Sequence, residues 1–537
     1  MSSYQILDAI AALPESHIVR TWWEGRLVSP GNGSWPQRPD QAVLDAMRSG
    51  VGGNPRGALV ESCIRQQYQT SGIEPPQRLS LLATPDCRTV TTGHQLCLAG
   101  GPAFTYYKIR TAIALAARLE KRWGTPVLPV FWMASEDHDF DEVSGLWSGE
   151  EWVRWNPSGP VGGPVGRMST DGVASLLKGW LDGMGSSEGW DSLIRESGNG
   201  ATLAQAMRHW IHALFPNGDV VVIDGDVPEL KSPFVSVMRK EVEEALVHRA
   251  VSEVDQTLSS MGFAPQVHVR ECNLFHMDDL GRHRLAAENG GWSALGGKKW
   301  ASKTDLLAAL ESDPHSFSPN ALLRPVYQNF LLPDVAMVGG MAEIAYWIQL
   351  TGVYERLGMT QPALVPRDGA LVLPQRWSRL LEKTHLGSND LGRPWTEWES
   401  EAIAASGPPD VKAWRQSVDE SANQSLENFS KLDASLAASV QAARARIHGV
   451  LDKLEQQGRK AVKRKETEAL ARLSRIHGWV QPMGVNQERI TSFIQLSVEW
   501  DRAENAPLTL SESLSRSMLE GHGEGDWRPL VHLLRQD

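Results

Sequence analysis

Residues 88–135 decide the fold and read RTVTTGHQLCLAGGPAFTYYKIRTAIALAARLEKRWGTPVLPVFWMAS. The β-branched residues of 88–93 are typical of a strand. Residues 102–123 repeat apolar side chains at helical spacing, and Gly124 follows as an expected helix end. Residues 125–135 form a continuous apolar run, which is typical of a strand buried on both faces. A strand, a helix and a second strand in this order predict a βαβ unit and therefore a parallel sheet.

The chain is expected to contain several domains, because its 537 residues exceed what one hydrophobic core usually supports. We predict an α/β protein with a parallel-sheet core, an inserted α/β domain and a long antiparallel coiled coil. The predicted segments are the first part of the core (1–149), an inserted connecting domain (150–315), the second part of the core (316–405), the coiled coil (406–480) and a C-terminal return to the core (481–537).

The coiled coil is predicted from the residues between about 411 and 477, where proline is absent and helix formers dominate. Apolar residues there follow the spacing of a coiled-coil seam, at Val440, Ala443, Ile447, Val450 and Leu454. Gly458 interrupts this pattern, so we expect a helical hairpin. The basic run GRKAVKRK, which starts at Gly458, is interpreted as a solvated helix face, with a polyanion site as the alternative.

The composition argues against some classes of function. A hydrophobic content of 41% is ordinary for a globular protein, and the net charge of -11 argues against a nucleic-acid surface. The four cysteines form no C-x-x-C pair and favour a reducing compartment. No apolar stretch approaches the roughly 20 residues of a membrane helix, and no signal-peptide pattern is found. We expect a cytoplasmic protein with neither a nucleic-acid nor a membrane partner.

Five carboxylates and one histidine crowd into residues 136–142, EDHDFDE, directly after the second strand. Ligands of a parallel sheet bind beyond the carboxyl ends of its strands, so this acidic segment falls where a cleft is expected. Carboxylates held this close raise one another's pKa, and one could act as a base or bind an amine. The alternative is that Ser135 caps a following helix that has Asp141 and Glu142 in its first turn.

A second candidate site lies in residues 91–108, TTGHQLCLAGGPAFTYYK. Gly93 allows a tight turn at the strand end, and His94 follows it. Gly101 precedes a helix whose free N–H groups attract anions, and Lys108 lies about two turns further along that helix. Together these residues predict a cradle for a phosphate or a carboxylate. A βα turn that holds no ligand is the alternative.

A third candidate site combines residues from three later segments. Arg324 precedes Pro325 in an apolar setting, where a guanidinium needs a carboxylate or phosphate partner. Glu343 and Tyr346 share one face of a predicted helix. Arg367 follows another predicted strand in VPRDG. Each of these residues alone is more often structural, but they occur together with the acidic segment.

Other motifs fail at specific positions. A calcium loop over 137–148 would need a glycine at Glu142 and a glutamate at Ser148. In GGWSALGGKKW, Trp300 stands where a P-loop needs Ser or Thr. No metal site is predicted. The cysteines do not align as nucleophiles, and Cys97 is expected to pack in its helix.

Four stretches resemble the cysteine ligase family of bacillithiol biosynthesis: TTGHQ…GGPAFTYYK, PVFWMASEDHDFDEV, SPNALLRPVYQNFLLPDVAMVGGMAEIAYWIQL and VPRDG. QPMGVNQER also resembles that family, and the likeness spans roughly residues 90 to 490. It implies a Rossmann-like core related to class I nucleotidyl transferases, inserted connecting segments and a coiled coil that forms a homodimer. The chain departs from the family at LAGGPA, where an LFTGPL-type segment is common, and from the H-x-G-H signature of the transferases at Thr91.

The resemblance implies a ligase that joins the carboxyl group of L-cysteine to the amine of glucosaminyl-malate and so forms bacillithiol. Making an amide from a free carboxylate needs activation, for which ATP is the expected cofactor. The predicted catalytic residues are His94, Glu136, Asp137 and His138. The predicted substrate-binding residues are Asp139, Arg324, Glu343, Tyr346 and Arg367, and the predicted phosphate-binding residues are Gly93, Gly101 and Lys108.

Two other functions stay open from the sequence. A nucleotidyl transferase that acts on another small acid or alcohol would release pyrophosphate without cysteine. A non-catalytic assembly protein would act through its coiled coil, while its core ignored all ligands. The acidic segment argues against the assembly protein, because a scaffold gains little from placing such a cluster at a strand end.

Overall fold

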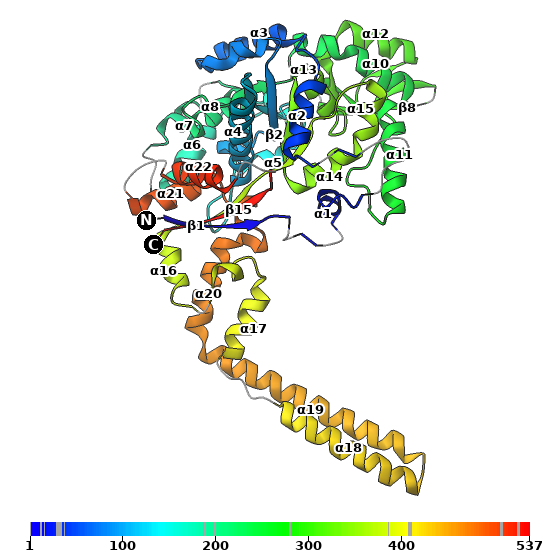
Figure 1. The fold of residues 1–537 in the computed structure, drawn as a ribbon, viewed down its shortest axis with the longest axis vertical. Helices are drawn as coiled ribbons and strands as arrows, with labels where there is room; N and C mark the ends of the chain where they lie inside the picture. Colours follow the sequence, from blue (N-terminus) through cyan, green and yellow to red (C-terminus); the bar gives the residue numbers. More distant parts are fainter. Residues whose placement is uncertain are drawn as a thin grey trace. The chain divides into compact units, whose positions relative to one another are not determined.

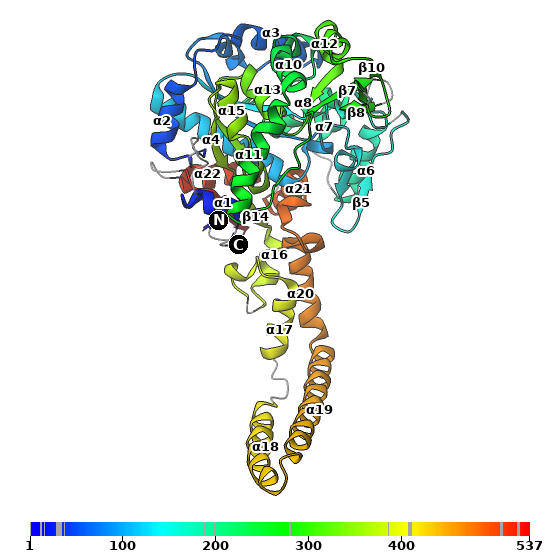
Figure 2. The same cartoon turned by 90° about the vertical axis from the view of Figure 1, so that its right-hand side faces the viewer.

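The structure is a computed structural model in which residues 2–10, 13–14, 17–27, 35–36, 38–159, 161–185, 189–197, 200–278, 281–288, 290–384, 386–405, 411–504, 509–522 and 527–536 are described. The chain forms two compact units (Figures 1 and 2). The first unit is Met1–Pro374 with Glu488–Asp537, and the second is Gln375–Gln487. Among the described helices, none has the length and apolar character that a membrane crossing requires.

A parallel sheet of five strands forms the core of the first unit, in the order β13-β12-β2-β3-β6. The strands are β2 Arg88–His94, β3 Val127–Met133, β6 Val221–Asp224, β12 Asp334–Gly339 and β13 Ala363–Pro366. Every residue of β3 is buried, as its continuous apolar sequence predicts. The parallel α/β core expected from residues 88–135 is therefore confirmed.

Helix α4 (Ala103–Trp123) connects β2 to β3 and packs on both strands. Its buried face includes Ile109, Leu115 and Leu119, none of which is exposed to solvent. The helix ends at Gly124, whose φ of 64° is left-handed, as the sequence predicts. Strand order runs from β2 toward β3 and β6 on one side and toward β12 and β13 on the other, so the topological switch point lies between β2 and β12.

Strand β6 lies within the segment 150–315 that the sequence assigns to an insertion, yet it pairs with β3 at the edge of the core sheet. Its Val221–Ile223 positions are buried, which explains why they join the core. The rest of that segment includes most of a separate five-stranded antiparallel sheet, in the order β10-β9-β8-β7-β11. Its strands are β7 Leu274–Asp278, β8 Gly281–Glu288, β9 Gly291–Ala294, β10 Lys299–Trp300 and β11 Phe317–Pro319.

A third sheet joins the two ends of the chain, as Figure 1 shows for β1 and β15. β15 (Leu530–Gln536) pairs antiparallel with β1 (Ser2–Asp8) and parallel with β14 (Gly369–Leu373). β4 (Gly145–Trp147) and β5 (Trp152–Arg154) form a short hairpin.

Helices cover these sheets in the first unit. Besides α4 they are α1 Ile18–Trp23, α2 Gln41–Gly50, α3 Gly57–Thr70, α5 Phe140–Val143, α6 Val173–Gly183, α7 Asp191–Arg195, α8 Leu203–Leu214, α9 Pro228–Lys231, α10 Val235–Glu244, α11 Leu246–Ser260, α12 Lys303–Ser312, α13 Arg324–Leu331, α14 Met341–Gln349, α15 Thr351–Leu357, α21 Phe493–Glu504 and α22 Thr509–Gly521.

The second unit is helical. Its helices are α16 Gln375–Leu381, α17 Trp395–Ala405, α18 Lys412–Leu432, α19 Leu436–Lys465 and α20 Thr467–Val480. Helices α18 and α19 form the expected antiparallel hairpin, which Figure 2 shows in side view. The predicted start of the coiled coil, at residue 406, lies outside the described residues.

The position of the hairpin turn differs from the prediction. The chain turns between Leu432 and Leu436, where the Asp433 carboxylate accepts a hydrogen bond from the Ser435 amide at 2.8 Å. Gly458 lies inside α19 instead. One glycine costs a helix only about 1 kcal/mol, which a helix of this length tolerates, whereas an Asp that bonds its own backbone favours a turn.

Candidate functional site

The first part of the candidate site surrounds Lys108, a side chain only 1% exposed. Its Nζ lies 2.8 Å from Glu343 Oε2 and also donates to the carbonyl of Gly93 at the end of β2. Burial lowers the pKa of Lys108, the Glu343 carboxylate opposes that shift, and the charges of Arg367 and Arg324 add to it. The predicted phosphate-binding lysine is thus buried among cations beside the switch point.

Glu343 reaches Lys108 from the first turn of α14. Its Oε2 also accepts a hydrogen bond from the amide of Gly340 at 2.9 Å, so the side chain caps its own helix. Tyr346 lies one turn later and bonds the guanidinium of Arg324, which begins α13. The helix face predicted for Glu343 and Tyr346 therefore faces two cations of the predicted site.

Arg367 lies just beyond the end of β13, and its amide donates to Gly339 of β12 at 2.8 Å. Its guanidinium forms a paired contact with Glu488, at 2.6 and 2.9 Å. Its Nε is buried and has no hydrogen-bond partner among the described residues. The Arg367 side chain also lies 5.5 Å from the ring centre of Phe104, which in turn meets the ring of His94 edge-on at 4.8 Å.

His94 ends β2 and is held as a neutral imidazole. Burial lowers its pKa well below the usual 6.5, and the positive charges of Lys108 and Arg367 lower it further. Cys97 Sγ lies 3.9 Å from His94 Nε2. Cys97 precedes α4 in a turn, so its expected place in the helix is wrong, although the side chain is buried as expected.

The two predicted glycines are required by close packing. A Cβ atom at Gly93 would lie 2.9 Å from the carbonyl oxygen of Trp132 on β3, and Gly93 is an extended strand residue, so the predicted turn there is not found. Gly101 has a φ of 80°, and a Cβ there would lie 2.9 Å from Cys97 Cβ. Both glycines let the backbone at the end of β2 and the start of α4 pack without gaps.

The acidic segment turns sharply after β3. Asp139 caps the short helix α5 by accepting a hydrogen bond from the Glu142 amide at 3.1 Å, and Asp141 and Glu142 occupy its first turn. Ser135 does not serve as the cap that the sequence suggested, because its hydroxyl donates to Asp224 at the end of β6. Three of the five acids thus lie at a helix start, as the alternative interpretation expected for Asp141 and Glu142.

Asp137 faces the end of β2. It accepts hydrogen bonds from the side chain of Gln95 and from the amide of His138, and it lies 3.2 Å from the guanidinium of Arg282. Burial alone would raise the pKa of Asp137, but the His138 and Arg282 contacts hold it well below the usual 3.8. Asp137 is 30% exposed and His138 44% exposed, so both side chains can be reached from solvent.

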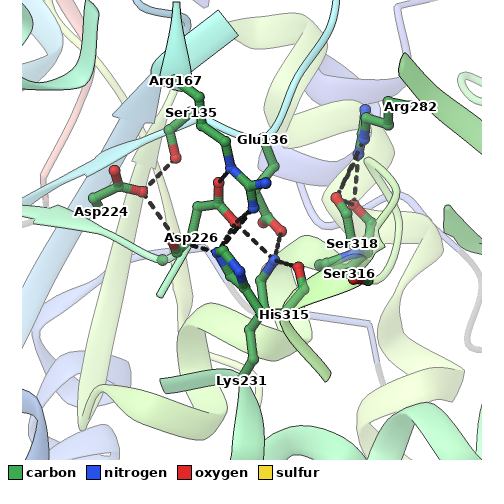
Figure 3. A network of polar contacts seen from close by, with 12 residues as sticks. Ser135, Glu136, Arg167, Asp224, Asp226, Lys231, Arg282, His315, Ser316 and Ser318 are labelled. Carbon is green, nitrogen blue, oxygen red and sulfur yellow. Dashed lines mark hydrogen bonds and ion pairs between the residues drawn. The ribbon is translucent and has the colours of Figure 1, made fainter. Parts of the chain in front are cut away.

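Glu136 belongs to a buried ionic network, which Figure 3 shows. Its carboxylate lies 2.7 Å from Lys231 Nζ, which also donates to Asp226 at 2.8 Å. Arg167 binds Asp226 with two hydrogen bonds of 2.7 and 2.8 Å. Burial raises the pKa of Glu136, while Lys231 and Arg167 overcome burial and hold the pKa of Asp226 well below 3.8.

The sequence thus predicts neighbouring strand ends correctly but not the direction of every side chain. His94 and Asp137 lie at adjacent tips of β2 and β3, and Gln95 links the two tips. Lys108, Glu343, Arg324 and Arg367 gather at the switch point, as their contacts and mutual charge effects indicate. Glu136 belongs to the network on the β6 side.

Several residues of this region escaped the sequence reasoning: Gln95, Phe104, Asp226, Lys231, Arg282 and Glu488. Asp224 and Asp226 in DGD follow a predicted strand, so the strand-end rule applied to the acidic segment would have found them. Glu488 lies in QPMGVNQER, which was already noted for its resemblance. Arg282 lies in an antiparallel hairpin and follows no such signal.

Two family models cover most of the chain. One, described as "Bacillithiol biosynthesis BshC, N-terminal Rossmann-like domain", matches residues 40–368. The other, "Bacillithiol biosynthesis BshC, C-terminal coiled-coil domain", matches residues 370–504. Together with the core sheet and the hairpin, they define a protein with a Rossmann-like domain followed by a coiled coil.

Curated relatives match over similar lengths. One from Flavobacterium johnsoniae is 32% identical over 83% of this chain and 85% of its own length. Others from Cytophaga hutchinsonii and Salinibacter ruber are 31% and 28% identical, over 84% and 85% of this chain and 86% of each relative. All three are named "Putative cysteine ligase BshC". The chain belongs to the BshC family of bacillithiol biosynthesis, and the enzyme class expected from its sequence, a ligase, is confirmed.

Proposed function

We propose that this protein adds L-cysteine to glucosaminyl-malate and forms bacillithiol. The observation that carries the proposal is the gathering of Lys108, Arg324 and Arg367 at the switch point of the core sheet, beside Asp137 at the next strand tip. Lys108 pairs with Glu343 and Arg367 pairs with Glu488, whereas Arg324 forms no ion pair with a carboxylate among the described residues. Such a surplus of positive charge suits the carboxylates of cysteine and malate.

ATP is the cofactor we propose for activating the cysteine carboxylate. The residues fit a phosphate group, because Thr105 Oγ1 in the first turn of α4 and Arg367 Nε are buried donors without described partners. An anion beside Lys108 would also offset the like charges that lower the pKa of that lysine. When bound, ATP would supply the phosphoryl or adenylyl group that turns the carboxylate oxygen into a leaving group.

The remaining steps, substrate binding and proton transfer, would be carried out by residues of this chain. Asp137 stays ionised across the neutral range, so it can hold an ammonium group or accept a proton through His138. Neutral His94 can accept a hydrogen bond at the tip of β2. Arg324 and Arg367 would bind the carboxylates of malate, with Tyr346 and Glu488 fixing their positions, while Glu343 fixes Lys108. Asp139 helps mainly by fixing the turn that carries Asp137.

The test is a reaction that contains glucosaminyl-malate, L-cysteine and ATP, analysed for bacillithiol by mass spectrometry. The double substitution Asp137→Asn with His138→Ala should lower the rate about 100-fold or more, because it removes the proton acceptor and its partner. Asp141→Asn changes an exposed acid of the same segment and is the matched control. Product formation at an equal rate in the double variant and the control would contradict the site assignment.

We also propose that the protein acts as a homodimer in the cytoplasm. Support for the dimer comes from α18 and α19, where Phe429, Ile447 and Val450 are 46%, 45% and 63% exposed although they are apolar. Helix pairs that carry an exposed apolar seam usually bury it against a second copy. Support for the cytoplasm comes from the four cysteines, all buried and free of disulfides.

A further inference from the structure

A group of two histidines and one aspartate lies where the chain's C-terminal segment meets the core. Asp368 lies between β13 and β14, His522 follows the last residue of α22, and His532 lies on β15. One ligand atom from each side chain lies within 4.8 Å of the other two. Asp368 and His532 are fully buried, and the side chain of His522 is 5% exposed. None of these residues belongs to the ligase site proposed above.

The nitrogen and oxygen atoms that face one another within this group do not all have a hydrogen-bond partner. His522 Nε2 lies 2.7 Å from Asp368 Oδ2, whereas His532 Nε2 lies 3.6 Å from the same oxygen, which is too long for a hydrogen bond. The buried His532 Nε2 has no hydrogen-bond partner among the described residues. A buried polar nitrogen that faces a carboxylate without bonding it carries a desolvation cost of about 1–3 kcal/mol. A cation between the three side chains would remove that cost.

The parts of these three side chains that face away from the centre of the group already contact other residues. His532 Nδ1 lies 2.8 Å from Ser517 Oγ, and Asp368 Oδ1 accepts a hydrogen bond from the Leu530 amide at 2.9 Å. The ring of His522 stacks on Trp527 at 3.9 Å. Protein metal sites commonly orient their ligands by such contacts to the atom that does not bind the metal. The free faces of all three side chains are thereby directed toward one another.

The backbone around the group also favours a positive ion. Gly521 ends α22, and a Cβ atom there would lie 3.1 Å from His532 Cε1, so a glycine allows the helix end to approach β15. The carboxyl end of a helix carries partial negative charge, which attracts cations. The Asp368 carboxylate, which contacts His522 at 2.7 Å, adds a negative charge to the group.

We propose that Asp368, His522 and His532 bind a divalent transition metal ion of the Zn²⁺ type. Two imidazoles and one carboxylate are a common ligand set for Zn²⁺, and a fourth position would take water or another ligand. Zn²⁺ bonds of roughly 2.0–2.2 Å place neighbouring ligand atoms about 3.5 Å apart. The 3.6 Å separation of Asp368 and His532 meets this value already, and His522 has to move outward by less than about 1 Å.

The ion would link the C-terminal strand to the segment that carries Arg367. Asp368 follows Arg367 directly, and its amide donates to Thr111 on α4 at 3.1 Å. Metal binding at this point therefore ties β15 and α22 to the core beside a residue of the proposed ligase site. Its expected effect is on stability, because Asp368 lies far in the sequence from His522 and His532.

The test measures zinc bound by the tag-free, full-length protein. The protein is stripped with a chelator, dialysed against micromolar Zn²⁺ and analysed by inductively coupled plasma mass spectrometry. We expect about one ion per chain and a higher melting temperature than the stripped protein has, since a ligand that binds only the folded state stabilises it. Replacing Zn²⁺ with Co²⁺ should give the visible absorption of a four-coordinate site.

His522→Gln should lose the ion and the Co²⁺ spectrum, and circular dichroism verifies that this variant stays folded. The matched control is His448→Gln on α19, where His448 also pairs with an aspartate at 2.7 Å but no third ligand lies among the residues that the structure describes. The control should keep the ion. Wild-type protein that binds no ion overturns the proposal even if the variant unfolds, and so does equal binding by His522→Gln. Either result would make this group a metal-free ion pair.

Discussion

Individual side chains at the end of β2 depend on one another through charge. Burial keeps His94 neutral, with a further contribution from the charges of Lys108 and Arg367, and the Glu343 carboxylate pairs with the Lys108 ammonium group. The sequence could nominate His94, Lys108 and Arg367, because strand ends and helix starts are visible in a pattern. It could not predict that Phe104 lies between His94 and Arg367, because side-chain direction depends on packing.

The neutral state of His94 predicts a pH dependence of stability. The folded protein resists protonating this buried imidazole, whereas the unfolded chain accepts a proton below about pH 6.5. Folding stability should therefore fall as the pH drops below that value, by up to about 1.4 kcal/mol per pH unit from this group. His94→Gln should show a shallower dependence in urea unfolding between about pH 7.5 and 5.5. An unchanged slope in the variant would show that His94 titrates normally.

The order of the strands determines which side chains each acid of the segment after β3 contacts. The acidic segment follows the end of β3, as the sequence indicated, and the strand character of residues 221–224 was also visible. Local sequence patterns could not predict that β6 pairs with β3, because strand order depends on long-range packing. For this reason Glu136, predicted as catalytic, lies against Lys231 and Asp226 of the β6 side.

The network beyond β6 predicts a large effect of one lysine on stability. Lys231→Met removes the cation that two buried carboxylates, Glu136 and Asp226, share. Breaking a buried ion pair from one side typically costs about 3–5 kcal/mol, because the remaining charge is left uncompensated. Urea unfolding at neutral pH measures the loss.

Lys178→Met is the matched control for that measurement. Lys178 pairs with Asp182 on the surface of α6, and its side chain is 61% exposed. Exposed pairs contribute little, so we expect a change within about 0.5 kcal/mol. Equal losses in the two lysine variants would mean that the network adds nothing to stability.

The whole chain combines a parallel-sheet core with a helical unit of its own. Composition and periodicity predicted both, since a βαβ pattern and a coiled-coil seam are local features of sequence. The sheet that joins β1, β15 and β14 was beyond such reasoning, because its strands come from distant parts of the chain. Gly458 was a misleading signal for the hairpin turn, since a single glycine is tolerated in a long helix.

The exposed seam of α19 predicts the oligomeric state. Ile447→Asp with Val450→Asp places two charges on an apolar face, so a dimer held by this face should dissociate. Analytical ultracentrifugation should give the mass of two chains for the wild type and of one chain for the variant. Gln456→Asp changes an exposed polar position of the same helix and should leave the dimer intact. A monomeric wild type would contradict the homodimer.

The central claim is that the core joins an activated cysteine carboxylate to an amine. It is tested most directly by supplying L-cysteine labelled with heavy oxygen in both carboxylate positions, together with glucosaminyl-malate and ATP. We predict bacillithiol that keeps one labelled oxygen, with the second found in AMP or inorganic phosphate. Absence of bacillithiol, or product whose missing label never enters a phosphate, would contradict the account.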